Sequence, residues 1–184
     1  YLSLTWNFGK DKASYDQFDK IISGDTIHNW IYCHIIDSNG NIFDTKADVI
    51  CNAVNCIGVM GAGVAKAFAD KFPEMYWSYQ NSCNSKMVNI GKGHYFYLSD
   101  EDNWKMIANV PTMFYPGSIA NLGDISLSLC DLFEVMNTHH LNTVVMPFLG
   151  CGIGRVKPKE FENLLYNFRT KHDISVLLVE YAGN

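Results

Sequence analysis

Residues 49–68 read VICNAVNCIGVMGAGVAKAF. The stretch begins as an apolar run, passes two asparagines and three glycines, and then repeats apolar residues at helical spacing. This pattern predicts a strand that turns directly into a helix. Gly58, Gly61 and Gly63 leave the turn without side chains, so either the turn itself is tight or a ligand approaches its backbone closely.

The length and charge of the chain bound its function. Its 184 residues, 48% of them hydrophobic, are typical of one domain with a sizeable core. A net charge of −5 without any basic run argues against general affinity for nucleic acid, which requires clustered Lys and Arg. No apolar run reaches the roughly 18 residues that cross a bilayer, so we expect no membrane association.

The six cysteines are scattered, and no two of them form a C-x-x-C pair. This spacing suggests neither a zinc site nor a disulfide framework. Several cysteines lie in apolar or glycine-rich runs, as reduced cysteines do. We therefore expect a cytoplasmic protein without a bound metal. We also expect a monomer that needs no cofactor.

Strand patterns and helix patterns alternate along the chain. Short runs rich in β-branched and aromatic residues predict strands at 30–36, 48–54, 94–98, 104–110, 143–148 and 174–181. Apolar residues three or four positions apart predict helices that begin near Val64 and cover 123–139 and 161–168. Such alternation predicts an α/β domain whose sheet is parallel in its centre and covered by helices on both faces. We expect residues 1–25 to be an N-terminal extension packed on a domain of residues 26–184.

A second glycine-rich junction follows the strand predicted at 143–148. Its sequence, LGCGIGRVKP, alternates Gly150, Gly152 and Gly154 just before another helix. Two such junctions at the carboxyl edge of one sheet can hold a diphosphate through backbone N–H groups, without a basic cluster. A dinucleotide fingerprint would need a third glycine where Lys66 stands, and the G-K-[ST] of a P-loop is absent.

Three motifs carry a family resemblance: N-A-V-N-C-I-G-V-M-G-A-G-V-A-K-A-F at 52–68, N-V-P-T at 109–112 and P-F-L-G-C-G-I-G at 147–154. In this order they resemble macro domains, which bind ADP-ribose. The likeness is greatest to the branch of antitoxin-type DNA ADP-ribosyl glycohydrolases and the terminal ADP-ribose protein glycohydrolase. Gly40-Asn41-Ile42 also resembles ADP-ribose 1″-phosphate phosphatases. The resemblance implies a three-layer α/β/α sandwich around a mixed, centrally parallel sheet.

The resemblance also implies roles for individual residues. Asn55 would hold the distal ribose and position the attacking water, which makes it the candidate catalytic residue, while Asn52 would orient the loop. Asn41 would accept from the adenine amino group, and Phe148 or Tyr181 would either stack on the ligand or pack in the core. The full set of expected ligand-binding residues is Asn41, Ile42, Asn52, Asn55, Gly58, Val59, Met60, Gly61, Gly63, Val64, Phe148, Gly150, Cys151, Gly152, Ile153, Gly154 and Tyr181.

Two positions depart from the catalytic pattern of that branch. Met113 stands where relatives carry a lysine, and Gly154 stands where the terminal ADP-ribose glycohydrolase carries an aspartate. The leading expectation is a hydrolase that removes a group from the distal ribose of an ADP-ribosylated macromolecule or of ADP-ribose 1″-phosphate. The alternatives are an ADP-ribose reader without turnover and a nucleotide-binding α/β domain unrelated to ADP-ribose.

Overall fold

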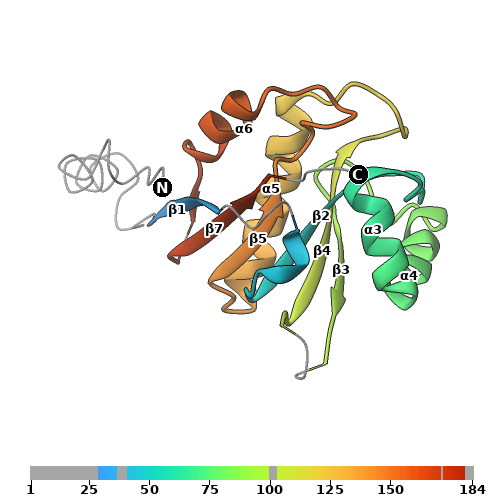
Figure 1. The fold of residues 1–184 in the computed structure, drawn as a ribbon, viewed down its shortest axis with the longest axis horizontal. Coiled ribbons are helices and arrows are strands. Elements are labelled where there is room, and N and C mark those ends of the chain that lie inside the picture. Colours follow the sequence, from blue (N-terminus) through green and yellow to red (C-terminus); the bar gives the residue numbers. More distant parts are fainter. Residues whose placement is uncertain (1–28, 37–40, 100–102, 171, 181–184) are drawn as a thin grey trace.

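The structure is a computed structural model that describes residues 29–36, 41–99, 103–170 and 172–180. The predicted N-terminal extension at 1–25 and the candidate ligand residue Tyr181 lie outside these ranges. Within them the chain folds into a twisted sheet covered by helices on both faces (Figure 1).

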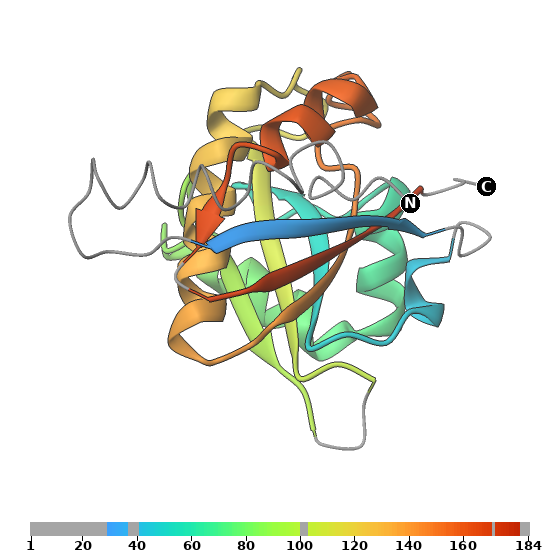
Figure 2. The ribbon, with the colours of Figure 1, turned by 90° about the vertical axis from the view of Figure 1, so that its left-hand side faces the viewer.

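Seven strands form the sheet in the order β3-β4-β2-β5-β7-β1-β6. The strands are β1 (Asn29–Ile36), β2 (Val49–Asn55), β3 (His94–Tyr97), β4 (Met106–Met113), β5 (Thr143–Pro147), β6 (Arg169–Thr170) and β7 (Ile174–Val179). The five central strands pair in parallel, whereas β3 and β6 pair antiparallel at the two edges. This confirms the predicted mixed, centrally parallel sheet. Figure 2 shows the strands rotating progressively from β1 to β4, the twist that L-residues impose.

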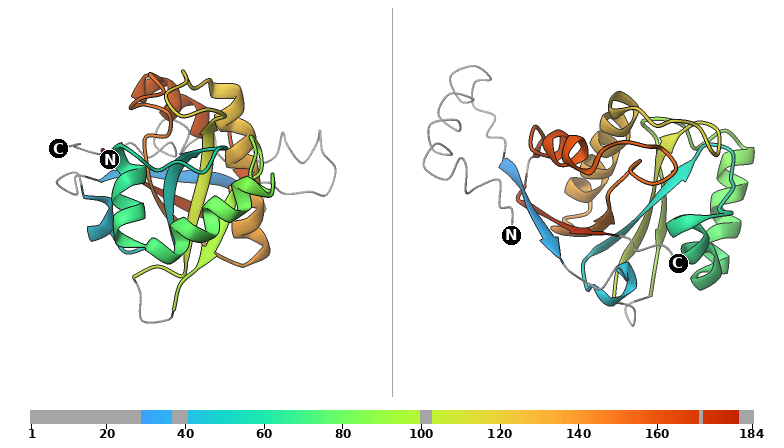
Figure 3. Two further views of the ribbon diagram at one scale, coloured as in Figure 1. Left: turned by 90° about the vertical axis from the view of Figure 1, so that its right-hand side faces the viewer. Right: turned by 45° about the horizontal axis from the view of Figure 1, so that its top comes forward.

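Four α-helices and one short 3₁₀ helix occur in the described part of the chain. They are η1 (Ile42–Asp44), α3 (Gly63–Lys71), α4 (Pro73–Asn84), α5 (Leu122–Thr138) and α6 (Pro158–Leu165). Helices α3 and α4 cover one face of the sheet and α5 and α6 cover the other (Figure 3). The predicted three-layer α/β/α sandwich is confirmed. Phe72 ends α3 and precedes α4, and Pro73 supplies the first residue of α4, where proline fits best.

The core has two parts because successive strand residues point to opposite faces of the sheet. In β2, Val49 and Cys51 join the apolar cluster beneath α5 and α6. Ile50 and Val54 join the cluster beneath α3 and α4. Strand β2 is therefore buried on both faces, which explains its nearly continuous apolar run.

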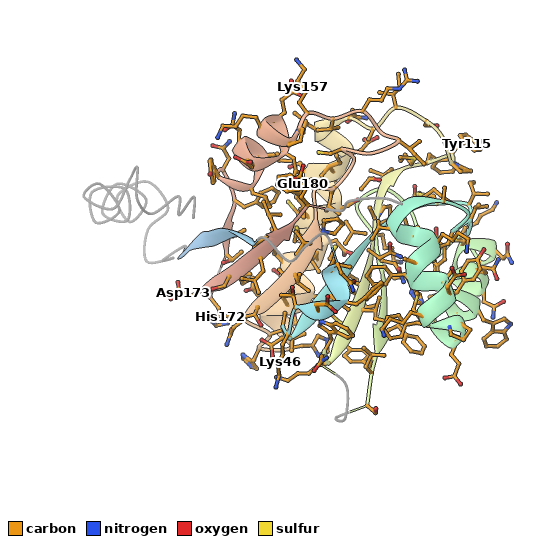
Figure 4. All side chains as sticks on the ribbon, in the orientation of Figure 1. Lys46, Tyr115, Lys157, His172, Asp173 and Glu180 are labelled. Atoms are coloured by element: carbon orange, nitrogen blue, oxygen red, sulfur yellow. The ribbon has the colours of Figure 1, made fainter. Side chains whose placement is uncertain are left out.

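The two edges of the parallel sheet are distinct in space. Residues that follow a strand or its loop lie at the carboxyl edge, and residues that precede a strand lie at the amino edge. Figure 4 labels Tyr115, Lys157 and Glu180 at the first edge and Lys46, His172 and Asp173 at the second. Across the described residues, no helix combines the length and the hydropathy needed to span a membrane.

Candidate functional site

Two glycine-rich loops meet at the carboxyl edge of the sheet. The first loop, residues 56–62, joins β2 to α3, and the second loop, residues 148–157, joins β5 to α6. Strands β2 and β5 are parallel neighbours, so the two loops leave the sheet side by side. The structure therefore brings together the two junctions that the sequence singled out.

Asn55 is the anchor of the first loop. Its side chain is nearly buried, with 6% of its surface exposed. The amide nitrogen donates to the Val59 carbonyl at 2.6 Å, and the amide oxygen accepts from the N–H groups of Ile57 at 3.0 Å and Val59 at 3.3 Å. The Tyr79 hydroxyl donates to the Asn55 carbonyl at 2.5 Å. Asn55 thus shapes the loop from within, as a turn residue at the end of its strand.

Asn52 lies deeper under the same loop and is fully buried. Its amide nitrogen donates to the Asn109 amide oxygen at 2.9 Å and lies 3.8 Å from the Met60 sulfur. This geometry supports the loop-orienting role expected for Asn52. Asn109 was missed as a site residue, although it opens the N-V-P-T motif.

The glycines of the first loop serve different purposes. Gly58 has φ +89°, and a Cβ there would meet the Cβ of Cys83 on α4 at 3.4 Å. Gly63, the first residue of α3, has φ +58°, which also favours glycine. Gly61 has neither constraint, because its backbone is not left-handed and a Cβ would approach only the Val59 side chain, at 3.8 Å. Nothing in the fold explains why position 61 lacks a side chain.

The glycines of the second loop divide in the same way. Gly150 has φ +76°, and a Cβ there would lie 2.7 Å from Ile125 Cδ1. A Cβ on Gly154 would lie 2.6 Å from the Gly150 carbonyl oxygen and 2.7 Å from the Cβ of Ala120. Gly152 is exposed, and a Cβ there would meet no atom of the described residues within 4 Å. The fold therefore requires Gly150, through its left-handed backbone and its close neighbours, and Gly154, through packing, whereas it does not require Gly152.

The N-terminus of α3 offers unpaired N–H groups at this edge. Its cap residue, Ala62, makes no side-chain hydrogen bond to the helix, and the first turn contains no acidic residue. Helix α5 begins differently, since the Asn121 side chain accepts from the Asp124 N–H at 2.8 Å. An uncapped helix N-terminus carries partial positive charge and is suited to an anion.

Met113, one of the two positions that depart from the catalytic pattern, lies beside Asn55. In the pairing of β2 with β4, Asn55 is opposite Met113, so a thioether occupies the neighbouring strand end where relatives were expected to carry a lysine. Met113 packs against the core beneath α5 and α6. The Lys66 ammonium forms an exposed ion pair with Asp70 at 2.5 Å, one turn along α3.

Other predicted ligand residues are partly committed to the fold. The Asn41 amide oxygen accepts from the Phe43 N–H at 3.1 Å and so caps η1. Ile42 is 1% exposed, so its side chain is unavailable to a ligand and only its backbone can make the predicted contact. The half-buried Phe148 ring packs edge-on against Phe161, with centroids 6.2 Å apart, which favours core packing over stacking on a ligand.

The remaining predicted residues differ in exposure. Val59 and Ile153 are exposed at the tips of the two loops, whereas Met60 is buried and Val64 is half-buried. Burial, aided by two nearby glutamates, raises the pKa of the Cys151 thiol to about 11. Burial likewise raises the pKa of Cys56 to about 11. Both cysteines are thus protonated thiols near neutral pH and are poor nucleophiles.

The described residues contain no cluster of three or more His, Cys, Asp or Glu that could hold a metal ion. The first loop, residues 56–62, has no polar side chain and offers only backbone groups, while the second loop adds the exposed side chains of Arg155 and Lys157. The arrangement is suited to an anionic ligand that contacts main-chain donors at the carboxyl edge of the sheet.

The family follows from comparison with known proteins. The profile of the macro domain family matches residues 51–165, and the chain belongs to that family. Membership in this family argues against the alternative of a nucleotide-binding α/β domain unrelated to ADP-ribose.

Relatives with assigned activities cover parts of the chain. It is 30% identical over 146 residues to a DNA ADP-ribosyl glycohydrolase of Mycobacterium tuberculosis, an alignment that covers 79% of this chain and 42% of that protein. It is 40% identical over 70 residues to an ADP-ribose 1″-phosphate phosphatase of Aspergillus oryzae, covering 38% and 33% of the two chains. The chain thus spans less than half the length of either relative.

A solved structure gives the same picture. The fold is similar to the macrodomain of Mycobacterium tuberculosis DarG, with a TM-score of 0.69 and 28% identity. The match covers 79% of this chain and 97% of that structure. Nearly all of the DarG macrodomain therefore has a counterpart here.

Proposed function

We propose that this macro domain binds ADP-ribose at the carboxyl edge of its sheet, with the two loops on either side of the diphosphate. One observation carries the proposal: Gly61 and Gly152, one in each loop, lack side chains although neither backbone conformation nor packing requires it. A ligand that contacts the main chain at both positions accounts for both glycines. The relatives whose names refer to ADP-ribose support this choice of ligand.

The charge of the protein agrees with recognition by main-chain donors. With a net charge of −5, the chain as a whole repels a diphosphate, so donors local to the two loops must provide the attraction. The uncapped N-terminus of α3 supplies such groups directly after the first loop. Asn41 supports adenine recognition, because an amide oxygen has two lone pairs and Phe43 occupies one of them.

The test introduces a carboxylate into each loop. Gly61→Glu and Gly152→Glu should each weaken ADP-ribose binding by at least about tenfold, because the new charge opposes the diphosphate at short range. Asn163→Glu, on the exposed surface of α6, adds the same charge to the whole protein and is the matched control. Calorimetry measures affinity, and circular dichroism confirms folding. Unchanged binding by both glycine variants would remove the two loops from the site.

We further propose that the domain is a hydrolase that removes a group from the distal ribose. Asn55 uses its amide oxygen and one N–H within the loop, so a second N–H stays available for a ribose hydroxyl or a water molecule. Orientation of that water by Asn55 and the substrate phosphate would replace a strong base. The candidate substrates are ADP-ribosylated DNA, ADP-ribosylated protein and ADP-ribose 1″-phosphate, the first and last matching the names of the two relatives.

A reader without turnover is the second candidate, and Met113 is the observation that favours it. It lies opposite Asn55 in the strand pairing and supplies no ionisable group. Incubation of the protein with each candidate substrate, followed by mass spectrometry of the products, decides between the two functions. Release of ADP-ribose from any substrate supports the hydrolase. Inactivity of the wild type together with activity of Met113→Lys would establish a reader built on a hydrolase scaffold.

Proposals on cellular context follow from composition. We propose that the protein is a cytoplasmic monomer. We also propose that it lacks general affinity for unmodified nucleic acid, because the sequence has no cluster of Lys and Arg. Sedimentation gives the oligomeric state, and fluorescence polarisation with unmodified single-stranded DNA gives the affinity. Tight, salt-sensitive binding to that DNA would contradict the proposal.

A further inference from the structure

A line of hydrogen bonds runs from helix α4 to the first loop beneath its surface. His94 on β3 is 8% exposed, and its Nε2 lies 3.0 Å from the Ser78 hydroxyl of α4. Its Nδ1 lies 3.0 Å from the Asn109 amide nitrogen on β4. Asn109 in turn accepts from Asn52, whose amide nitrogen lies 3.8 Å from the Met60 sulfur of the loop.

The chemistry of the amide groups determines which atom donates and which accepts in each of these hydrogen bonds. The Asn109 amide nitrogen can only donate, so the Nδ1 of His94 must accept and the ring proton must sit on Nε2, facing Ser78. The ring is therefore neutral. Burial lowers the pKa of His94, which favours the same neutral form.

A second contact joins His94 to the loop. The Tyr79 ring packs edge-on against the His94 ring, with centroids 6.0 Å apart, and the Tyr79 hydroxyl donates to the Asn55 carbonyl. His94 thus supports both asparagines of the N-A-V-N motif, Asn52 through Asn109 and Asn55 through Tyr79.

We infer that His94 is a positioning residue for the ligand loop, and that its protonation loosens the loop and weakens ligand binding. The effect on binding rests on the proposed function, whereas the effect on the loop does not.

Protonation of His94 changes the hydrogen bonding stepwise. A proton on Nδ1 would face the Asn109 amide nitrogen, donor against donor, so the Asn109 amide must rotate. After this rotation the Asn109 amide nitrogen would face the Asn52 amide nitrogen. Because both nitrogens are donors, the Asn52 amide must rotate in turn. That rotation removes the amide hydrogen from Met60. The buried amide oxygen of Asn52 has no partner among the described residues, so only the contacts of its amide nitrogen, to Asn109 and Met60, hold the present orientation.

The surrounding groups do not supply a compensating charge. On α4, Tyr79 has its pKa raised by burial and stays neutral, while Glu74 lines the surface groove outside Ser78. On β4 the facing residue is the uncharged Asn109. Asp131 on α5 is engaged by the Tyr95 hydroxyl at 2.5 Å and by the Gly93 N–H at 2.8 Å.

The test uses two neutral replacements of the histidine. The oxygen of His94→Asn takes the place of the accepting Nδ1 and cannot be protonated, whereas His94→Gln places its amide near Nε2 and leaves Asn109 without its acceptor. In the wild type, ADP-ribose affinity should fall by about fivefold or more between about pH 8 and pH 5, the low end of typical coupling between two sites. His94→Asn should lose this dependence, and His94→Gln should bind weakly at both pH values.

A measurement without ligand separates the inference from the proposed function. In the free wild-type protein, the NMR signals of the Met60 and Gly61 amides should shift with the same midpoint as the His94 ring, and in His94→Asn they should not. Loop signals independent of the ring titration would overturn the inference. Absence of ADP-ribose binding with coupled loop signals would instead refute the proposed function alone. Equal pH dependence of affinity in the wild type and His94→Asn would also overturn the coupling to binding.

Discussion

Gly154→Ala should destabilise the domain although it adds a single methyl group. The new Cβ would lie 2.6 Å from the Gly150 carbonyl oxygen and 2.7 Å from the Cβ of Ala120. Neither atom is the end of a flexible side chain, so the backbone of the second loop must move. That movement strains the hydrogen bond of 3.0 Å from the Ala120 N–H to the Gly154 carbonyl. Overpacking of this kind lowers the free energy of unfolding by about 1–3 kcal/mol, and we expect Gly154→Ala to lower it by about 2–3 kcal/mol.

Gly152→Ala, two residues away, is the matched control. Its Cβ would have no neighbour within 4 Å, and its backbone is not left-handed. We expect a change within about 0.5 kcal/mol, or a slight gain from the stiffer unfolded chain. Urea unfolding measures both variants, with an unchanged slope confirming the same transition. Equal destabilisation by the two substitutions would refute the separation of packing glycines from ligand glycines.

Three further predictions concern single contacts. Tyr79→Phe leaves the Asn55 carbonyl without its donor, so stability in urea should fall by about 1–2 kcal/mol, and an unchanged midpoint would contradict the anchoring role. Asn55→Ala should lower turnover far more than affinity, whose loss should be about 1–2 kcal/mol; full turnover would exclude Asn55 from catalysis. Burial raises the pKa of Asp48, but donation from Lys105, Asn142 and Thr143 outweighs it and the net pKa is lowered. Its stabilisation is therefore complete above the unfolded-state pKa of 3.8 and is lost as the pH falls through the lower folded-state value. The free energy of unfolding should therefore fall less steeply with decreasing pH in Asp48→Asn than in the wild type. An identical fall in both proteins would show that Asp48 does not contribute to the pH dependence.

Local patterns predicted much of the fold. The strand predicted at 48–54 and the helical spacing after Gly63 correspond to β2 and α3, because each pattern depends on which neighbouring residues are buried. Helix α4 was not resolved in advance, although Met75, Tyr79 and Cys83 are its buried residues at four-residue spacing. Polar residues between them obscured the stripe. Strand β6 has two residues, too few to produce a periodic pattern.

The site was less predictable because its key contacts join distant parts of the chain. Spacing alone could not distinguish Gly152 from Gly154. The difference arises from the path of the loop, which brings the Gly150 carbonyl close, and from Ala120, which lies more than thirty residues earlier. The hydrogen bonds of His94 likewise depend on the pairing of β3 with β4 and on the packing of α4. The family resemblance indicated which loops matter, and the structure shows which of their residues are needed by the fold itself.

Calorimetric titration with ADP-ribose, AMP and ribose 5-phosphate tests the central claim most directly. If both loops hold the diphosphate while adenine and the distal ribose occupy their own contacts, ADP-ribose should bind at least about a hundredfold more tightly than either fragment, since neither fragment reaches all the contacts. AMP binding as tightly as ADP-ribose would contradict the two-loop site.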